Sequence, residues 1–165
     1  MIKFTSATLG ILIILFLVLS YSNNETSMSL EQGNGQLSTV NISGSTVVVD
    51  IVDTFFSRRV GLSGRESLLP DHGMLFVFDE IDFHGIWMKD MLFPIDIIWI
   101  GSNISEEGTL IEQSEPFYVI DVKKDVQPDS YPEIFYPNGE TKFVLEVSSG
   151  FTEKHNIKIG DEVHF

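Results

Sequence analysis

The sequence contains no cysteine, and it has only 10 lysine and arginine residues against 24 acidic residues. The absence of cysteine excludes disulfide bonds, a thiol nucleophile, zinc sites with cysteine ligands and lipid attachment through cysteine. The net charge of −14 argues against nucleic-acid binding, because neutralising phosphates requires clustered lysine and arginine. We therefore expect an acidic, solvated surface, and cation binding stays open.

Length limits the number of domains. A chain of 165 residues has room for one ordinary domain and an appendage, but not for two domains. Its hydrophobic fraction of 43%, which includes 13 phenylalanines, is enough to build a core.

Charged residues are also missing between Lys3 and Glu25, where an apolar run begins at Phe4 and ends near Tyr21. At about 18 residues, this run lies between the core of a signal peptide and a single membrane span. We therefore interpret residues 1–22 as a signal peptide or a membrane anchor helix, and the length favours the anchor.

Charge on either side of this run indicates its orientation. Lys3 precedes it, whereas Glu25 and Glu31 follow it, so we expect the N-terminus inside the cytoplasm and the rest of the chain outside. The predicted location is the cell membrane, with a single pass, or the exterior if the chain is cleaved after about Ser22.

Residues 23–39 are polar, rich in Ser, Asn and Gly, and show no apolar periodicity, which predicts a flexible spacer. Glycosylation-type sequons begin at Asn24, Asn41 and Asn103, but with this much Ser and Thr the pattern is weak evidence of modification.

Residues 40–165 are expected to form one globular domain. A short helix is predicted within residues 53–65, with Asp53 or Thr54 as its N-cap and glycines at its end, and a helical turn within residues 151–157. Strands are predicted from apolar, β-branched runs, and a long irregular segment is expected after Pro116. The strand segments are 45–53, 73–79, 94–101, 108–115, 142–150 and the end of 159–165.

This pattern predicts an α+β fold. Many strands at short spacing favour a compact, mainly antiparallel sheet that is curled or barrel-like, with two short helices, after an N-terminal hydrophobic helix.

Four segments stand out together: RRVGLSGRESLLPDHGMLFVF, FHGIWMKDMLFPIDIIWI, KFVLEVSSGF and IKIGDEVHF. In this order and spacing they resemble one prokaryotic family, the domain of unknown function 192, and the resemblance extends from about Val47 to Phe165. It implies a compact α+β, partly barrel-like fold, often behind a signal sequence or anchor, and it implies no activity. The family's central motif usually reads Phe-Trp-Met-Lys-Asn-Thr, whereas this chain has Asp90 and Met91 at the last two positions.

The segment FHGIWMKDMLFPIDIIW places polar residues in an apolar run. If residues 83–89 are extended, His84 and Met88 point to one face and Trp87 and Lys89 to the other. Asp96 shares a face with Ile98 and Ile100, and a charge there needs a cation or several backbone N–H donors. Lys89, Arg65 and Arg59 are the candidate cations.

Two interpretations of these residues remain open. The first is a structural ion pair beside a tryptophan packed in the core. The second is a pocket for a small polar or sugar-like ligand, with an indole platform and charges that orient the ligand. The candidate ligand-binding residues are Arg65, Trp87, Lys89, Asp96 and Glu146.

A pocket of this kind predicts a binding or accessory module, and three other functional classes are possible: an enzyme, a metal-binding protein and a structural or interaction module. An enzyme could use the two carboxylates as general acid and base, and it would require a strongly perturbed carboxyl pKa, which binding alone does not. A copper site built from His84, Met88, Met91 and Met74 does not converge on one strand face, so neither a metal nor another cofactor is predicted. A third possibility is a structural or interaction module, in which the aromatic segment around Tyr131 either packs over the barrel end or is offered to a partner. If Tyr131 closes over Trp87, this segment would be the lid of the pocket. No protein partner is identifiable from the sequence.

Overall fold

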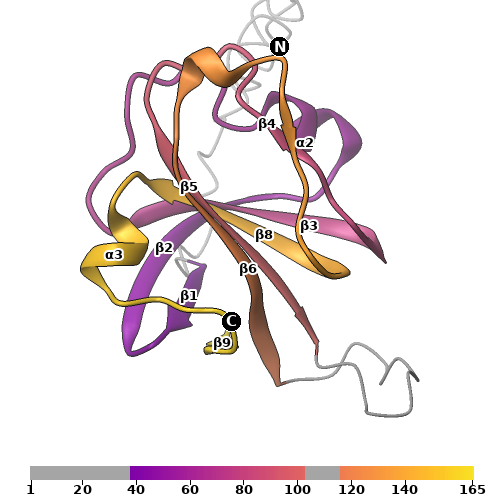
Figure 1. The fold of residues 1–165 in the computed structure, drawn as a ribbon, viewed down its shortest axis with the longest axis vertical. Coiled ribbons are helices and arrows are strands. Elements are labelled where there is room, and N and C mark those ends of the chain that lie inside the picture. The colour runs from indigo at the N-terminus through magenta and orange to yellow at the C-terminus, as the bar shows by residue number, and fades with distance from the viewer. Residues whose placement is uncertain (1–37, 103–115) are drawn as a thin grey trace, which may run out of the picture. The chain divides into compact units, whose positions relative to one another are not determined.

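Seven strands close into a barrel in the order β1-β2-β3-β8-β5-β6-β9, and β9 pairs back onto β1 (Figure 1). The computed structural model describes residues 38–102 and 116–165. The barrel strands are β1 (Thr39–Ile42), β2 (Ser45–Val52), β3 (His72–Asp82), β5 (Ile95–Ser102), β6 (Phe117–Val126), β8 (Thr141–Ser148) and β9 (Glu162–His164). The other elements are α2 (Phe55–Val60), β4 (Ile86–Trp87), the 3-10 helix η1 (Pro128–Ser130), β7 (Ile134–Phe135) and α3 (Phe151–Lys154).

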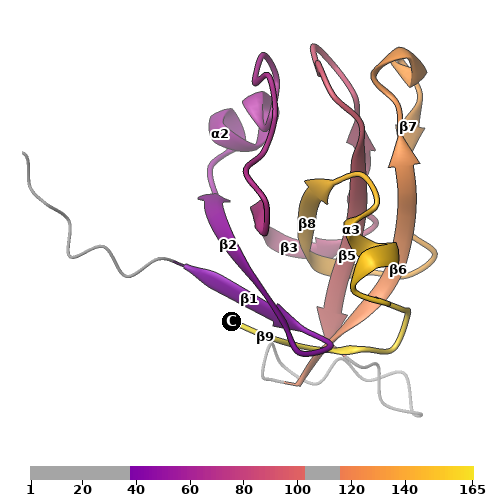
Figure 2. The ribbon, with the colours of Figure 1, turned by 90° about the vertical axis from the view of Figure 1, so that its left-hand side faces the viewer.

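Strand directions agree with the prediction of a mainly antiparallel sheet. Only β2 and β3 pair in parallel among the described barrel strands, and the chain between them contains α2. Short β4 pairs with β7 outside the barrel, and Figure 2 shows β7 and α2 at the same end of the molecule. The described residues therefore confirm a mostly β, barrel-like domain with two short α-helices.

Strands β3, β8 and β5 are neighbours in the barrel and are covered on both faces, because two separate apolar clusters use their alternate residues. The interior cluster contains Leu75, Ile98 and Leu145 from these strands. The outer cluster contains Phe76, Ile97 and other residues of the same strands, packed with Ile86 of β4 and with Leu62, which follows α2. Double burial explains why these strand sequences lack a polar face.

Helix α2 begins at a capping box. The Thr54 hydroxyl accepts a hydrogen bond from the backbone N–H of Ser57 at 3.1 Å, and the Ser57 hydroxyl accepts one from the N–H of Thr54 at 3.0 Å. The helix ends at Gly61, whose φ of 51° favours glycine. The predicted N-cap and glycine stop are therefore both found, with Thr54 and not Asp53 as the cap.

Two barrel strands, β1 and β6, were not predicted from the sequence, and neither was short β7. The segment after Pro116 was expected to be irregular, but residues 117–126 form β6, a ten-residue strand. Its pattern is hidden because prolines flank it and its second half carries exposed Lys123 and Lys124. Strand β1 was also missed, since it is only four residues long and was assigned partly to the spacer.

Some predictions fall outside the described residues. These are the hydrophobic helix and signal or anchor of residues 1–22, the spacer up to residue 37, and the strand predicted over 108–115. Within residues 38–102 and 116–165, no helix has both the length and the apolar character needed to span a membrane.

Asp96 is fully buried on the interior side of β5 and is satisfied without any cation. Its carboxylate accepts hydrogen bonds from the backbone N–H groups of Asp125 at 2.9 Å, Gly150 at 3.3 Å and Thr152 at 2.9 Å. The Thr152 hydroxyl donates a further bond at 2.6 Å. The Asp96 carboxylate thus fixes the start of α3 against β5 and β6. Of the two kinds of partner expected for Asp96, the structure shows the backbone N–H donors, and none of the candidate cations pairs with it.

Replacement of this carboxylate should destabilise the domain. In Asp96→Ala, the buried donors around the site lose their acceptor, so we expect the free energy of unfolding to fall by about 3–5 kcal/mol. Urea unfolding of the full chain measures this loss. Asp129→Ala is a matched control, because Asp129 is exposed, and it should change stability by less than about 0.5 kcal/mol. An Asp96→Ala variant as stable as the wild type would contradict the assigned role.

Candidate functional site

A pocket of about 390 Å³ has three walls. They are formed by α2 and the residues that follow it, by the segment 85–91, and by the outer face of the sheet. Its walls are mainly apolar and include Leu62, Phe76, Phe78, Ile86 and Met91. A volume of this size suits a small organic ligand, and apolar walls with few polar groups are typical of ligand sites.

Large apolar side chains stand exposed around this pocket. Phe55 and Trp87 both line it, with 76% and 36% of their surfaces exposed. The Trp87 ring meets the Tyr131 ring edge to face, with 6.2 Å between the ring centroids. Pairing of β4 with β7 places Trp87 opposite Ile134, so the aromatic loop does pack on the central motif.

Glu146 lines the pocket from β8 and is only 4% exposed. The register places it between Met74 of β3 and Ile97 of β5, two fully buried apolar residues. No hydrogen bond or ion pair to its carboxyl is found among the described residues. Burial alone raises the pKa of Glu146 from 4.5 to about 8. The pocket therefore contains a buried carboxyl group that the described part of the protein does not partner.

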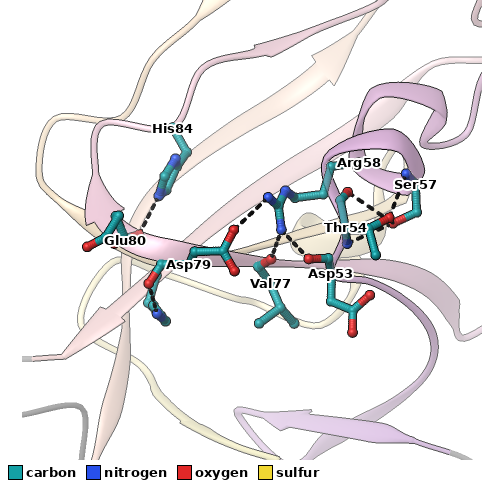
Figure 3. Close-up of polar contacts among 9 residues, drawn as sticks. Asp53, Thr54, Ser57, Arg58, Val77, Asp79, Glu80 and His84 are labelled. Carbon is teal, nitrogen blue, oxygen red and sulfur yellow. Dashed lines mark hydrogen bonds and ion pairs between the residues drawn. The ribbon is translucent and has the colours of Figure 1, made fainter.

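Arg58 lies in the wall of the pocket, but its guanidinium is already used (Figure 3). It donates hydrogen bonds to the Val77 carbonyl at 2.7 Å and to the Asp53 carbonyl, and it forms an ion pair of 3.0 Å with Asp79. It also lies over the Phe78 ring, 5.2 Å from the centroid. These contacts make Arg58 a fixed link between α2 and β3.

Lys89 and Arg59 supply the other two cations of the pocket lining. The Lys89 ammonium pairs with Asp90 at 2.6 Å, and its hydrogen bond to that carboxylate raises the pKa of Lys89. Arg59 is exposed and makes no hydrogen bond or ion pair with the described residues. Arg59 is therefore the pocket cation most available to a ligand.

The structure brings together three of the five residues predicted from sequence, because Trp87, Lys89 and Glu146 all line the pocket. Arg65 is not among them, since it pairs with Asp50 at 2.7 Å on the exposed side of β2. Asp96 is not among them either. It pairs in register with Val147, whereas Glu146 pairs with Ile97, so the two carboxylates point to opposite faces of the sheet. They cannot act together as an acid and base pair.

Helix α2 contributes residues to the pocket that were not predicted from the sequence. Phe55, Arg59 and Val60 line the pocket, and Phe55 and Val60 are exposed although apolar. The sequence signal for this contribution was the pair of phenylalanines beside two arginines in one short helix. Apolar residues next to charged ones in so short a helix cannot all be buried in the core, so some of them are exposed.

The residues considered for copper have other roles. Met74, Met88 and Met91 are buried in the outer cluster, and the His84 ring stacks on Phe78 with 3.6 Å between centroids. His84 Nε2 donates to the Glu80 carbonyl at 2.9 Å (Figure 3), and burial lowers the pKa of His84. Within residues 38–102 and 116–165, no three His, Cys, Asp or Glu residues lie together as a metal would require.

A second hollow, of about 200 Å³, lies beside α3 and is lined by Asp71 and Lys154. Ser45 Oγ lies 2.8 Å from His155 Nδ1, and His155 Nε2 lies 3.7 Å from Asp71. This order of side chains resembles a hydrolase triad, but Ser45 does not line the hollow. A serine that does not face the hollow cannot attack a substrate bound there, so we assign these contacts to the packing of α3.

Residues 38–165 match the family described as uncharacterized ACR, the domain of unknown function 192 (DUF192). The chain belongs to this family. The match covers both the barrel and the residues that line the pocket, so the four segments that resembled the family did identify it. None of the curated protein sequences matches the chain.

Two crystal structures resemble this DUF192 chain. One is a protein of unknown function from Novosphingobium aromaticivorans DSM 12444, with 26% identity, a TM-score of 0.65, and coverage of 77% of this chain and 84% of that one. The other, from Sinorhizobium meliloti 1021, is described as a proposed transcription regulator. It has 25% identity and a TM-score of 0.63, and the alignment covers 76% of this chain and 91% of that one.

The buried Glu146 should make the stability of the domain depend on pH. Its pKa is higher in the folded protein than the ordinary 4.5, so the folded state holds the proton more tightly than the unfolded chain. The stabilisation is fully present below about pH 4.5 and is lost as the pH rises to about 8. Between about pH 5 and pH 8.5, Glu146→Gln should therefore gain stability relative to the wild type by a few kcal/mol.

Urea unfolding across this pH range measures the difference. Glu133→Gln is the control, because Glu133 is exposed, and its profile should follow that of the wild type. Parallel profiles for the wild type and Glu146→Gln would show that Glu146 ionises in the folded domain as readily as in the unfolded chain.

Proposed function

We propose that this protein is an extracytoplasmic binding or accessory module, tethered to the membrane or secreted, which holds a small, partly polar ligand in the pocket beside Glu146. The observation that supports binding most strongly is the buried Glu146 carboxyl in the lining of an apolar pocket, where none of the described residues pairs with it. Leaving a buried polar group unpaired costs free energy, and such exceptions are frequently functional.

The pocket is suited to a ligand with an apolar body. Trp87 and Phe55 offer flat apolar surfaces, while Leu62, Phe76 and Ile86 form the deeper walls. The polar side chains of the lining are Arg58, Arg59, Ser63, Lys89 and Glu146. Arg58, Ser63 and Lys89 are already paired with other groups of the protein, which leaves Glu146 on β8 and Arg59 on α2 to meet a ligand. Few polar groups on an apolar surface orient a ligand without requiring it to be strongly hydrophilic.

One observation also favours an enzyme as a second candidate. A carboxyl with a pKa of about 8 is suited to general acid or base catalysis near neutral pH. Among the described residues, however, the pocket offers no second carboxyl, and Lys89 is bound to Asp90. Binding needs no further group, so it accounts for the described residues more completely. Incubation of a bound ligand with the protein, followed by mass spectrometry, separates the two functions, because only an enzyme converts the ligand.

A blocked pocket tests ligand binding. Val60 lines the pocket and is 45% exposed, so Val60→Trp should fill the space without disturbing the core. The matched control is Ile159→Trp, at a position that is 63% exposed and does not line the pocket. A thermal-shift screen would compare both variants with the wild type against sugars, small carboxylates, amines, short peptides and metal ions.

A ligand at 100 times its dissociation constant should stabilise the wild type and the Ile159→Trp variant by about 2.7 kcal/mol, which raises the melting temperature by several degrees. The Val60→Trp variant should lose this increase. An equal increase in both variants would place binding outside the pocket, and no increase with any compound would count against a ligand-binding function.

The proposed location rests on the sequence of residues 1–31. An apolar run follows Lys3, and acidic residues follow the run, which is the charge distribution of a domain that lies outside the cytoplasm. Alkaline phosphatase fused after Phe165 is active only outside the cytoplasm, so the fusion should be active in intact cells. Carbonate extraction should leave a retained anchor in the membrane pellet. Activity confined to a cytoplasmic reporter at the same position would contradict this location.

A further inference from the structure

Among residues 38–102 and 116–165, the Glu146 carboxyl has no hydrogen-bond or ion-pair partner of the kind that a buried carboxylate requires. Met74 and Ile97 lie beside Glu146 in the sheet, and Glu146 lines the pocket. By contrast, the other buried carboxylate, that of Asp96, accepts three backbone N–H bonds and one hydroxyl bond. The sheet thus satisfies one buried carboxylate completely and leaves the other facing an open pocket.

We propose that the ligand of this pocket is an apolar primary monoamine, whose ammonium group pairs with the Glu146 carboxylate. This inference rests on the proposed function of the pocket as a ligand site. An ammonium group supplies both the positive charge and the N–H donors that the carboxylate lacks, and charge-assisted hydrogen bonds are the stronger kind.

The walls of the pocket also suit a cation. Phe55, Phe76, Phe78 and Trp87 line it, and aromatic faces attract ammonium groups through their negative quadrupole. The net charge of −14 attracts cations towards the surface as a whole. Val60, Leu62, Ile86 and Met91 add aliphatic and thioether surface, which matches an alkyl or aryl body next to the amine. The Ser63 hydroxyl of the lining is already used, because it donates to the Lys89 carbonyl at 2.8 Å.

The pocket cations indicate why the ligand carries only one positive charge. Arg58 is paired with Asp79, and Lys89 is paired with Asp90, so a neighbouring carboxylate compensates both. Arg59 has no such partner among the described residues. A second ammonium on the outer end of a ligand would lie near this guanidinium and be repelled, whereas an uncharged end would not.

Binding of an ammonium should release the proton of Glu146 to solvent. In the empty pocket at neutral pH the carboxyl is mostly protonated, because its pKa is about 8. The charged groups facing the pocket are Arg58, Arg59 and Lys89, while the flanking strands present Met74 and Ile97. The affinity for an amine should therefore rise about tenfold per pH unit below about pH 8 and level off above it.

Isothermal titration calorimetry on the full chain tests the proposal with four probes of matched length: hexylamine, hexan-1-ol, hexanoate and 1,6-diaminohexane. Hexylamine should bind at least about tenfold more tightly than each of the other three. Glu146→Gln keeps the shape of the side chain but cannot ionise, so it should lose about tenfold or more of the affinity for hexylamine, together with its pH dependence. In Arg59→Gln, the preference for hexylamine over 1,6-diaminohexane should shrink, because the guanidinium that repels the second ammonium is gone.

The outcomes separate this inference from the proposed function. If hexan-1-ol or hexanoate binds as tightly as hexylamine, and Glu146→Gln leaves affinity unchanged, the amine inference is wrong although the pocket still binds ligands. The inference is also wrong if none of the four probes binds while another compound of the thermal-shift screen does. If no compound of either set binds, the binding function itself fails.

Discussion

Double burial of strands β3, β8 and β5 is the constraint on which the rest of the structure depends. One face of these strands fills the barrel, and the other is covered by the segment around β4 and by Leu62, which follows α2. A sheet covered on both sides has no wet face, so any charged residue within it must find a partner or remain protonated. Two carboxyl groups occur in these strands at fully buried positions, Asp96 and Glu146.

These two carboxyl groups meet that constraint in opposite ways. Asp96 is held as an acceptor by the backbone that begins α3, so its charge contributes to the architecture. Glu146 faces a hollow, where burial without a partner raises its pKa to about 8. A group of this kind lowers the stability of the fold as the pH rises from about 4.5 to about 8, and a ligand that pairs with it would remove that cost. The pocket is therefore explained more fully as a binding site than as a packing defect.

Much of the fold could be predicted from the sequence, because local patterns specified it. The apolar runs of β3, β5 and β8, the cap at Thr54 and the stop at Gly61 are all local signals. Strand β6 could not be predicted in this way, since its exposed lysines and flanking prolines hide the alternation, and its pairing with β5 and β9 is what makes it a strand.

The site was predictable only in part, for a geometric reason. Trp87, Lys89 and Glu146 stood out as polar or aromatic residues in apolar strands, and all three line the pocket. Asp96 stood out for the same reason but faces the other side of the sheet. Only the register between β5 and β8 shows that the two carboxyl groups face opposite sides, because Asp96 lies opposite Val147 and Glu146 lies opposite Ile97. The composition of α2 was a signal for Arg59 at the pocket, whereas the pairing of Arg65 with Asp50 depends on how the chain after α2 folds back beside β2 and carries no local signal in the sequence.

The most direct measurement of the central claim is the pKa of Glu146 itself. Carbon-13 NMR of the side-chain carboxyl in the full chain, assigned by comparison with Glu146→Gln, follows its ionisation with pH. The structure predicts a midpoint of about 8, moving lower when an ammonium ligand is bound. A midpoint near the ordinary value of 4.5 in the empty protein would show that the carboxyl already has a partner, and the account of the pocket would be wrong.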